Sequence, residues 1–256
     1  MAAPRSEGGL PPSVYLGRHL DWVRQTLARL EPGYRFKWDI YFERLEELAK
    51  SATRFLDAGC GDNKTASELK GSRLCVGIDV ERPSSGAPPK GWDGALSLRR
   101  FTGRRVSGRL EKLPFRGGTF DLVGCRHVIE HLDDPSAVFT ELRRVMTPGG
   151  RILMQTVNRS SPLIALTRIM GEPLRGWFRR HRYGRTDADP FALRDRFNDP
   201  ALFEIPPAGF RLVSITMTQD VDLQSHLGFR LSYLLVCWTR KRPYGRSTIT
   251  AEWERV

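Results

Sequence analysis

Phe55-Leu-Asp-Ala-Gly-Cys-Gly-Asp-Asn63 reads as an apolar strand that runs directly into a glycine-rich turn. Glycines let a backbone approach a ligand closely, and open α/β sheets bind ligands beyond the carboxyl ends of their strands. A second apolar run, at 74–79, also ends in an acid, Asp79, which stands 22 positions after Asp57. An acid at that distance can accept hydrogen bonds from both hydroxyls of a ribose. These two runs predict a nucleoside-binding sheet edge, and a tight turn without a ligand is the alternative.

The rest of the chain alternates helical and strand-like patterns. Apolar residues recur at three- and four-residue steps over 16–30 and 40–48, and again in a helix that carries Val138, Leu142 and Val145. Strand-like runs fall at 53–57, 74–79, 104–108, 119–124 and 151–157. This alternation predicts an α/β fold with a mostly parallel sheet. The runs 210–217 and 231–239 have no clear helix between them, which predicts an antiparallel hairpin at the C-terminal edge.

The expected domain organisation is simple. Residues 1–12 look like a disordered tail, 13–240 like one domain, and 241–256 like a C-terminal tail. Within the domain, residues 158–205 break the alternation of strands and helices and are interpreted as an inserted helical cap over the sheet.

Composition narrows the class of protein. The 256 residues are 40% hydrophobic and 27% charged, which suits a globular chain with a real core. The longest apolar run is far shorter than the roughly 20 residues that cross a bilayer, and the first residues lack the apolar core of a secretory signal. The four cysteines show no CxxC spacing, so neither a disulfide framework nor a structural zinc site is predicted. We therefore expect a cytoplasmic protein.

Net charge is the unusual feature of the composition. Lysine and arginine exceed aspartate and glutamate by 12, and the pI is about 10.1. Such a balance favours anionic partners, which include nucleic acid, anionic lipid headgroups and phosphorylated substrates. The alternative is an arginine-rich surface without a specific partner, because the excess is spread along the chain.

Five motifs in order resemble the class I S-adenosylmethionine-dependent methyltransferases. They are the glycine turn at 57–61, the acid at Asp79, Leu113-Pro-Phe115, the run at 117–123 and the helix and turn at 142–150. The resemblance covers about residues 55–159 and implies a Rossmann-like methyltransferase fold with a mostly parallel seven-stranded sheet. It also implies S-adenosyl-L-methionine as cofactor and methyl transfer as activity.

The resemblance assigns a set of cofactor-binding residues. Asp57, Ala58, Gly59, Cys60 and Gly61 would hold the amino acid end of the cofactor. Asp79 would take both ribose hydroxyls. The remaining members of the expected set are Val80, Leu110, Glu111, Cys125 and Arg126.

One position departs from the family pattern. Arg109 stands where the family usually has an aspartate that accepts from the adenine amino group, and arginine has no acceptor. Either the backbone at Leu110 or the side chain of Glu111 would then recognise adenine, or cofactor affinity is reduced. A non-catalytic homologue that has kept the fold remains an alternative.

The candidate acceptor side lies just after the fourth strand. His127 and His131 are four residues apart with Glu130 beside the second, and histidine is the natural general base at neutral pH. His131, with His127 as second candidate, is the predicted catalytic base; a purely structural role is the alternative. No metal is predicted, although His127, Glu130 and His131 form a candidate ligand set by resemblance to the ubiquinone-biosynthesis O-methyltransferases.

The insert suggests what the acceptor is like. Between 161 and 185 an apolar helical stripe accompanies six arginines, a composition typical of a helix on an anionic membrane surface or of a substrate lid. With the family likeness, this predicts O-methylation of a small-molecule or lipid-linked acceptor, with peripheral contact to an anionic membrane as a further expectation. RNA methylation is the alternative that the charge suggests, but the fourth strand ends without the signature of amino-group methylators of nucleic acid.

Overall fold

The computed structural model describes most of the chain with gaps. The described residues are 17–61, 69, 74–80, 104–162, 194, 196–221, 226–239 and 241–256. The expected tail at 1–12, residues Asp62 and Asn63 of the glycine turn, and most of the expected cap at 158–205 therefore lie outside the described residues.

The described elements follow the chain in this order. The helices are α1 (Gly17–Leu30), α2 (Lys37–Ala49), η1 (Ile129–His131), α4 (Pro135–Val145), α7 (Pro200–Glu204), α8 (His226–Thr239) and η2 (Pro243–Gly245). The strands are β1 (Arg54–Ala58), β2 (Leu74–Asp79), β3 (Arg104–Ser107), β4 (Phe120–Arg126), β5 (Met146–Val157), β6 (Phe210–Thr218) and β7 (Thr248–Arg255).

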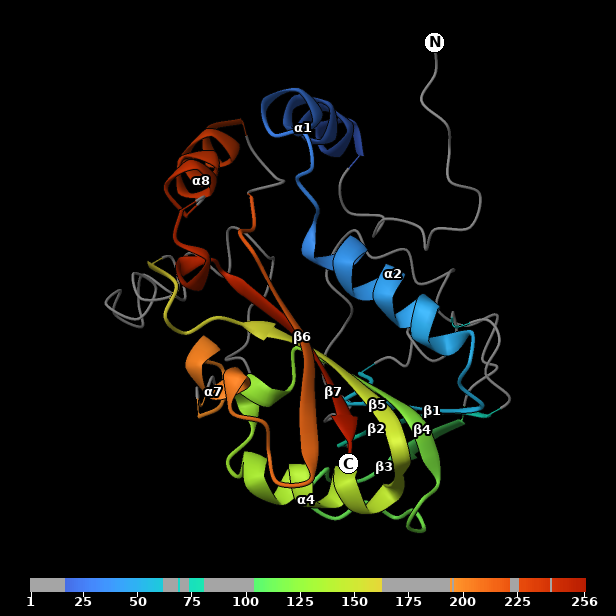
Figure 1. Ribbon diagram of the computed structural model, residues 1–256. Coiled ribbons are helices and arrows are strands. Elements are labelled where there is room, and N and C mark those ends of the chain that lie inside the picture. Colours follow the sequence, from blue (N-terminus) through green and yellow to red (C-terminus); the bar gives the residue numbers. More distant parts are fainter. Residues whose placement is uncertain are drawn as a thin grey trace.

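The seven strands of the described chain form one sheet in the order β3-β2-β1-β4-β5-β7-β6. Strands β1 to β5 pair in parallel, while β7 runs antiparallel to both of its neighbours, β5 and β6. Strand β6 therefore points the same way as β5. This arrangement confirms the predicted α/β class, the mostly parallel sheet and the antiparallel pair at the C-terminal edge (Figure 1).

Helices cover both faces of the sheet. On one face α2 packs Tyr41, Leu45 and Ala49 against the strands, and on the other α4 and α7 close a larger apolar cluster (Figure 1). Neighbouring strand residues divide between the two faces, so Phe55 packs with α2 and Leu56 with the α4 side. A strand buried on both faces shows a continuous apolar run, and the runs that predict β1 and β4 have this character.

A third apolar cluster lies at the end of the sheet. It joins Val23 and Leu27 of α1 to Phe229 and Val236 of α8, with Val221 after β6 between them. Figure 1 shows the two helices beyond the end at which β6 finishes. Because β6 runs parallel to β5, this is the carboxyl edge of the sheet, where open α/β folds bind ligands.

The predicted strand at 231–239 is wrong, because these residues belong to helix α8. A short apolar run does not distinguish a buried strand from a helix by composition alone. In the structure, burial follows the helical period: Phe229, Val236 and Thr239 are buried, while Leu231 and Leu234 are exposed.

The predicted C-terminal tail at 241–256 is also wrong in its main part. Thr248–Arg255 is strand β7, which lies between β5 and β6 and is the true partner of β6. Its polar residues suggested an exposed tail, yet Glu252 is 1% exposed and accepts from Arg44 and Arg151. The buried carboxylate of Glu252 is tolerated because the guanidinium groups of Arg44 and Arg151, which are partly exposed, pair with it.

Trp253 provides a test of this interior strand. It is fully buried and packs against the rings of Phe139 and Phe203 at centroid distances of 5.4 and 5.2 Å. We expect Trp253→Ala to lower the free energy of unfolding by about 3–5 kcal/mol, the usual cost of deleting a buried tryptophan. Trp238→Ala, at a site 47% exposed, should cost under about 1 kcal/mol. Equal midpoints for the two variants in urea unfolding would contradict the placement of β7.

Candidate functional site

The turn after β1 is tied to the end of β2. The backbone N–H groups of Gly59 and Cys60 both donate to the carbonyl of Ile78, at 2.8 and 3.1 Å. The N–H of Gly61 donates to Oδ2 of Asp79 at 2.6 Å. Gly59 has φ 78° and Gly61 has φ 52°, a region that favours glycine. The two signals that the sequence offered, the glycine turn and the acid 22 positions later, therefore meet in one hydrogen-bonded unit.

Gly59 also touches the turn that follows β4. A Cβ atom on Gly59 would lie 2.1 Å from Cγ2 of Val128, far inside contact distance. The carboxyl ends of β1, β2 and β4 thus converge, with no space for a side chain between the first and the third. Val128 was not among the predicted site residues, and no sequence pattern marked it.

A buried carboxylate makes this region electrostatically negative. Asp57 is 3% exposed directly before the turn. Burial, and then the charges of Asp57 and Asp79, raise the pKa of the Cys60 thiol to about 12. Burial, and then Asp57, raise the pKa of Tyr41 well above its usual value. Burial is the larger cause for both groups, and the nearby carboxylate charges add a smaller negative contribution, which favours a ligand with positive charge.

The residues expected to bind ribose and adenine lie after β2 and β3. The carbonyl of Asp79 accepts from Gly108 N at 3.0 Å, which fixes the chain after β3 beside the acid. Leu110 is buried at 6% exposure, so its side chain belongs to the core. Arg109, the residue that departs from the family pattern, is exposed and donates through Nη2 to Oε1 of Glu111 at 3.2 Å. The arginine thus occupies one oxygen of the carboxylate that was expected to replace the missing aspartate.

Two other predicted cofactor residues are engaged elsewhere through their side chains. Cys125 is 2% exposed within β4, and burial, followed by the charges of Glu130 and Asp57, raises the pKa of its thiol. Arg126 places its guanidinium 5.0 Å from the ring centroid of Phe42 on the α2 side. A contact of Cys125 with a cofactor would therefore come from its backbone.

The turn after β4 contains a strained histidine. His127 has φ 55°, and it is the one described residue other than glycine with a positive φ. Its backbone N–H donates to the carbonyl of Gln155 on β5 at 2.7 Å, and Nδ1 of its ring lies 3.1 Å from Oε1 of Glu130. Since an ionised carboxylate only accepts, Nδ1 carries the hydrogen. His127 thus holds the turn, and strain at a ligand edge is typical of functional sites.

Glu130 is the buried centre of this turn. Its side chain is 2% exposed, and Oε2 accepts from the hydroxyl of Thr156 at 2.8 Å. Burial alone would raise the pKa of this carboxyl, but the hydrogen bonds from His127 and Thr156 together lower it. The backbone carbonyl of Glu130 accepts from Arg194 N at 2.7 Å, so the end of the expected insert returns to this turn.

His131 ends the η1 turn next to this unit. Its N–H donates to the carbonyl of Val128 at 2.9 Å, and the residue is half-buried. It stays a predicted base. Across the described part of the chain, no three His, Cys, Asp or Glu side chains converge as metal ligands. The candidate ligand set of His127, Glu130 and His131 is therefore not assembled, because His127 and Glu130 bond to each other.

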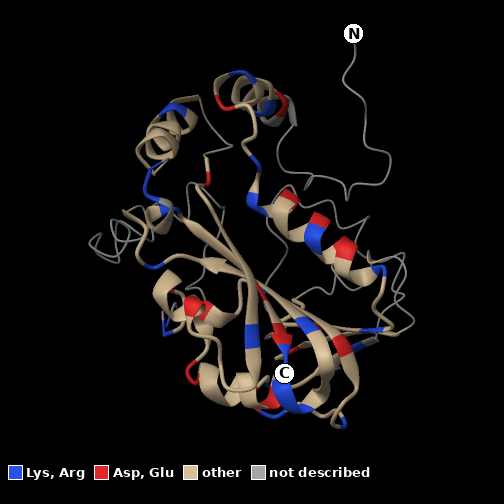
Figure 2. Ribbon diagram, viewed as in Figure 1, with Lys and Arg blue, Asp and Glu red and all other residues tan. Residues whose placement is uncertain are grey.

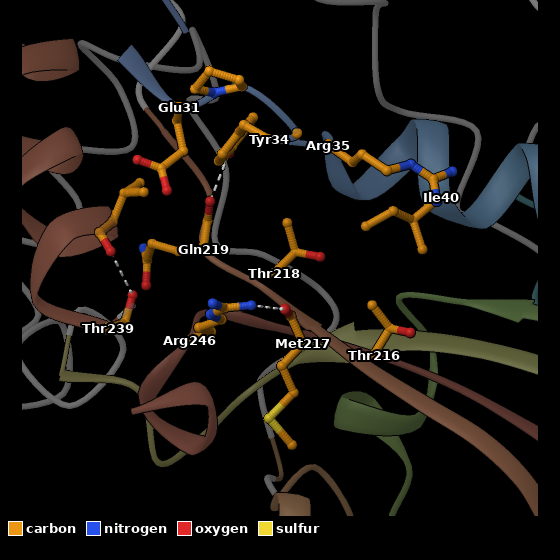
Figure 3. A pocket seen from close by; sticks show the side chains of 13 residues that line it. Glu31, Tyr34, Arg35, Ile40, Thr216, Met217, Thr218, Gln219, Thr239 and Arg246 are labelled. Carbon is orange, nitrogen blue, oxygen red and sulfur yellow. Dashed lines mark hydrogen bonds between the residues drawn. The ribbon is translucent and has the colours of Figure 1, made fainter. Parts of the chain in front are cut away.

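A cavity of about 370 Å³ opens at the same edge, beyond β6 (Figure 3). It lies between the α1–α2 linker, the end of β6, α8 and Arg246. Thr218 and Gln219 line it at 5% and 3% exposure, and neither Thr218 Oγ1 nor Gln219 Oε1 has a hydrogen-bond partner among the described residues. Buried polar atoms of this kind are normally satisfied, so water or a ligand is expected here. No pattern along the chain indicates this cavity, because its lining comes from four separate segments.

Taken together, a glycine turn, an acid at the end of the next strand and a sheet of this order define a Rossmann-like nucleoside-binding protein. Comparison with known proteins makes the class specific. Residues 56–154 match the family model described as a methyltransferase domain. Residues 56–154 of the chain are therefore similar to a methyltransferase domain.

Two curated relatives match a part of the chain. A ubiquinone biosynthesis O-methyltransferase of Pseudomonas putida is 30% identical over 131 residues, which cover 49% of this chain and 53% of that protein. A malonyl-[acyl-carrier protein] O-methyltransferase of Legionella pneumophila is 32% identical over 142 residues, 54% of this chain and 46% of that protein. The chain spans about half the length of these curated relatives.

Two solved structures show the same fold. The PH0226 protein of Pyrococcus horikoshii superposes with a TM-score of 0.53 at 18% identity, covering 90% of this chain and 99% of that one. The N-methyltransferase NodS of Bradyrhizobium japonicum, in complex with S-adenosyl-L-homocysteine, superposes with a TM-score of 0.50 at 14% identity, covering 93% and 98%.

The raised pKa of Cys60 gives a direct test of the turn. A pKa of about 12 leaves the thiol protonated at pH 8, and only the thiolate reacts with alkylating reagents. In the native protein at pH 8, we expect iodoacetamide to modify the exposed Cys237 well before Cys60, as followed by peptide mass spectrometry. Denaturant should abolish the difference. If Cys60 reacted as fast as Cys237 in the native state, the raised pKa of the Cys60 thiol would be refuted.

Proposed function

We propose that this protein transfers a methyl group from S-adenosyl-L-methionine to an oxygen of a small-molecule or lipid-linked acceptor. The observation that carries the proposal is the convergence of the glycine turn, Asp79 and the turn at His127–His131 on one sheet edge. The names of the two relatives, both O-methyltransferases, support oxygen as the acceptor atom.

The residues present fit the cofactor. The turn at Gly59 and Gly61 brings bare backbone to the ligand edge, and the negative potential around Asp57 suits a molecule with an ammonium and a sulfonium. Asp79 has a second carboxylate oxygen beside the one that accepts from Gly61, and a ribose hydroxyl could donate to it. When bound, S-adenosylmethionine supplies a methyl group on a positively charged sulfur.

The protein itself supplies alignment and proton removal. Glu130 and His127 bond to each other, and Glu130 bonds to Thr156, which holds the turn after β4 in place before η1. In this proposal His131 accepts the proton that the acceptor hydroxyl loses as its oxygen bonds to the methyl carbon. When the acceptor and the methyl donor are already bound in the reactive orientation, little further entropy is lost on reaching the transition state. This loss of entropy in advance is the main source of rate acceleration in such transfers.

The cavity beyond β6 would receive the remote part of an elongated acceptor. Three strand spacings separate β4 from β6, or roughly 14 Å at the usual distance between strands. That separation is too long for a reacting atom and suits a tail whose polar group reaches Thr218 and Gln219. A lipid-linked or otherwise elongated molecule has this shape.

A transfer assay tests the proposal. The purified protein with methyl-tritiated S-adenosylmethionine should label a lipid or small-molecule extract and leave an RNA pool unlabelled. Label in RNA alone, lost steeply with added salt, would favour the RNA alternative instead. Binding of the cofactor without label in any pool would favour the non-catalytic homologue.

The cofactor site makes a separate prediction. Asp79→Ala should weaken binding of S-adenosylmethionine by about 1–3 kcal/mol, because a carboxylate acceptor is lost. Asp121→Ala is the control, since Asp121 accepts from Thr53 and Arg54 at the opposite end of β1. It should lower the unfolding temperature while calorimetric titration returns an unchanged affinity. Unchanged affinity in the Asp79 variant would remove this residue from the site.

The base assignment can be tested by turnover. We expect His131→Ala to lower kcat by about 10²-fold or more, with the cofactor affinity unchanged and the loss smaller at high pH. His226→Ala serves as control, because His226 packs on Trp22 in the α1–α8 cluster with ring centroids 4.2 Å apart. A His131 variant with full turnover across the pH range would return this histidine to a structural role.

A further inference from the structure

Helix α8 exposes a row of large apolar side chains. Leu227, Leu231, Leu234 and Trp238 are 68%, 57%, 64% and 47% exposed. Their spacings of four, three and four residues place them on one side of a helix with 3.6 residues per turn. Scattered exposed leucines are ordinary on protein surfaces, whereas an aligned row of four on 14 residues is not.

The orientation of this row is fixed by the opposite side of the helix. Phe229 and Val236 are buried in the cluster with α1, and Thr239 is 1% exposed. The helix therefore cannot roll its leucines inward without exposing that cluster. The apolar row (Leu227, Leu231, Leu234 and Trp238) is thus a stable surface of the fold.

The charged residues of α8 and of the two described residues after it, 241 and 242, are all positive. Helix α8 contains Arg230 and no acidic residue, as Figure 2 shows. Exposed Lys241 and Arg242 follow the helix, and the guanidinium of Arg242 lies 4.9 Å from the ring centroid of Trp238. Helix α2, by contrast, carries both signs (Figure 2). Leucine and tryptophan on a helix without acidic residues, next to arginine and lysine, are typical of a helix that lies in the plane of a membrane interface.

We propose that the apolar row of α8 docks on the surface of an anionic lipid bilayer. The leucines and Trp238 would enter the boundary between headgroups and acyl chains, and Arg230, Lys241 and Arg242 would pair with lipid phosphates. Across the described helices, none is long and apolar enough to cross a membrane. The contact is therefore one that lies on the bilayer.

A second copy of the chain fits this surface less well. In a symmetric dimer the same patch lies on both sides of the interface, so that cations of one copy would lie close to cations of the other. Like charges at an interface oppose association, whereas a bilayer rich in phosphate attracts all of them. The net charge of +12 acts in the same direction.

Docking would place the cavity beyond β6 close to the bilayer. Val236 and Thr239, on the inner side of α8, line that cavity, while the apolar row faces outward. A lipid-linked acceptor could then reach the sheet edge directly from the membrane. The docking itself does not depend on methyl transfer, so it can be tested without an acceptor.

The test is cosedimentation of the full chain with vesicles. We expect binding to vesicles of phosphatidylglycerol and phosphatidylcholine, weaker binding to phosphatidylcholine alone, and a loss of about tenfold or more in partitioning for Leu231→Ser with Leu234→Ser. Ile205→Ser with Val213→Ser is the matched control, because it removes two apolar side chains that are 69% and 40% exposed outside α8. The control should bind like the unmodified protein.

Two further measurements keep the outcome decisive. Brominated acyl chains should quench tryptophan fluorescence in the unmodified protein and should quench it less in Trp238→Phe. If the leucine variant does not fold, the variant Arg230→Glu with Lys241→Glu replaces it in the binding assay and should also bind anionic vesicles more weakly than the unmodified protein. The proposal is overturned if the unmodified protein does not bind anionic vesicles or if the α8 variants bind as well as the control. A concentration-dependent dimer in lipid-free solution that the leucine variant abolishes would also overturn it, in favour of a second copy.

Discussion

The contact of the Gly59 backbone with Val128 is the constraint on which the site depends. It joins the turn after β1 to the turn after β4, and the bonds from Gly59, Cys60 and Gly61 to the end of β2 complete the junction. A side chain at Gly59 would push the two turns apart, and the carboxyl ends of three strands would no longer share one ligand edge. Close packing leaves no room for partial compensation.

Two buried carboxylates, Glu130 and Asp57, carry negative charge near this junction, and they have different effects. Glu130 is stabilised as an anion because His127 and Thr156 bond to it, and it fixes the turn that carries His131. Asp57 lies beneath the glycine turn and makes the thiol of Cys60 harder to ionise. Glu130 thus fixes the position of the turn after β4, whereas Asp57 provides a negative charge near the site where a cationic ligand would bind.

The order of the last strands extends the functional edge beyond the cofactor. Because β7 inserts between β5 and β6, the end of β6 faces the same way as the ends of β1 and β4. The α1–α8 cluster then covers that end, with a polar cavity on its inner side and apolar side chains on its outer side. One helix thus borders both the proposed acceptor site and the proposed membrane contact.

The sequence by itself determined what is local or periodic. Strands β1, β2 and β4, helices α1, α2 and α4, and the pairing of the glycine turn with Asp79 follow from apolar runs, period and fixed spacing. Only the tertiary structure decided the rest, because it depends on what packs against each segment. Residues 231–239 form a helix since one of their faces meets α1, and 248–255 form a strand since Arg44 and Arg151 satisfy Glu252. Neither Val128 at the cofactor turn nor the cavity at Thr218 and Gln219 is visible along the chain, because distant segments build both.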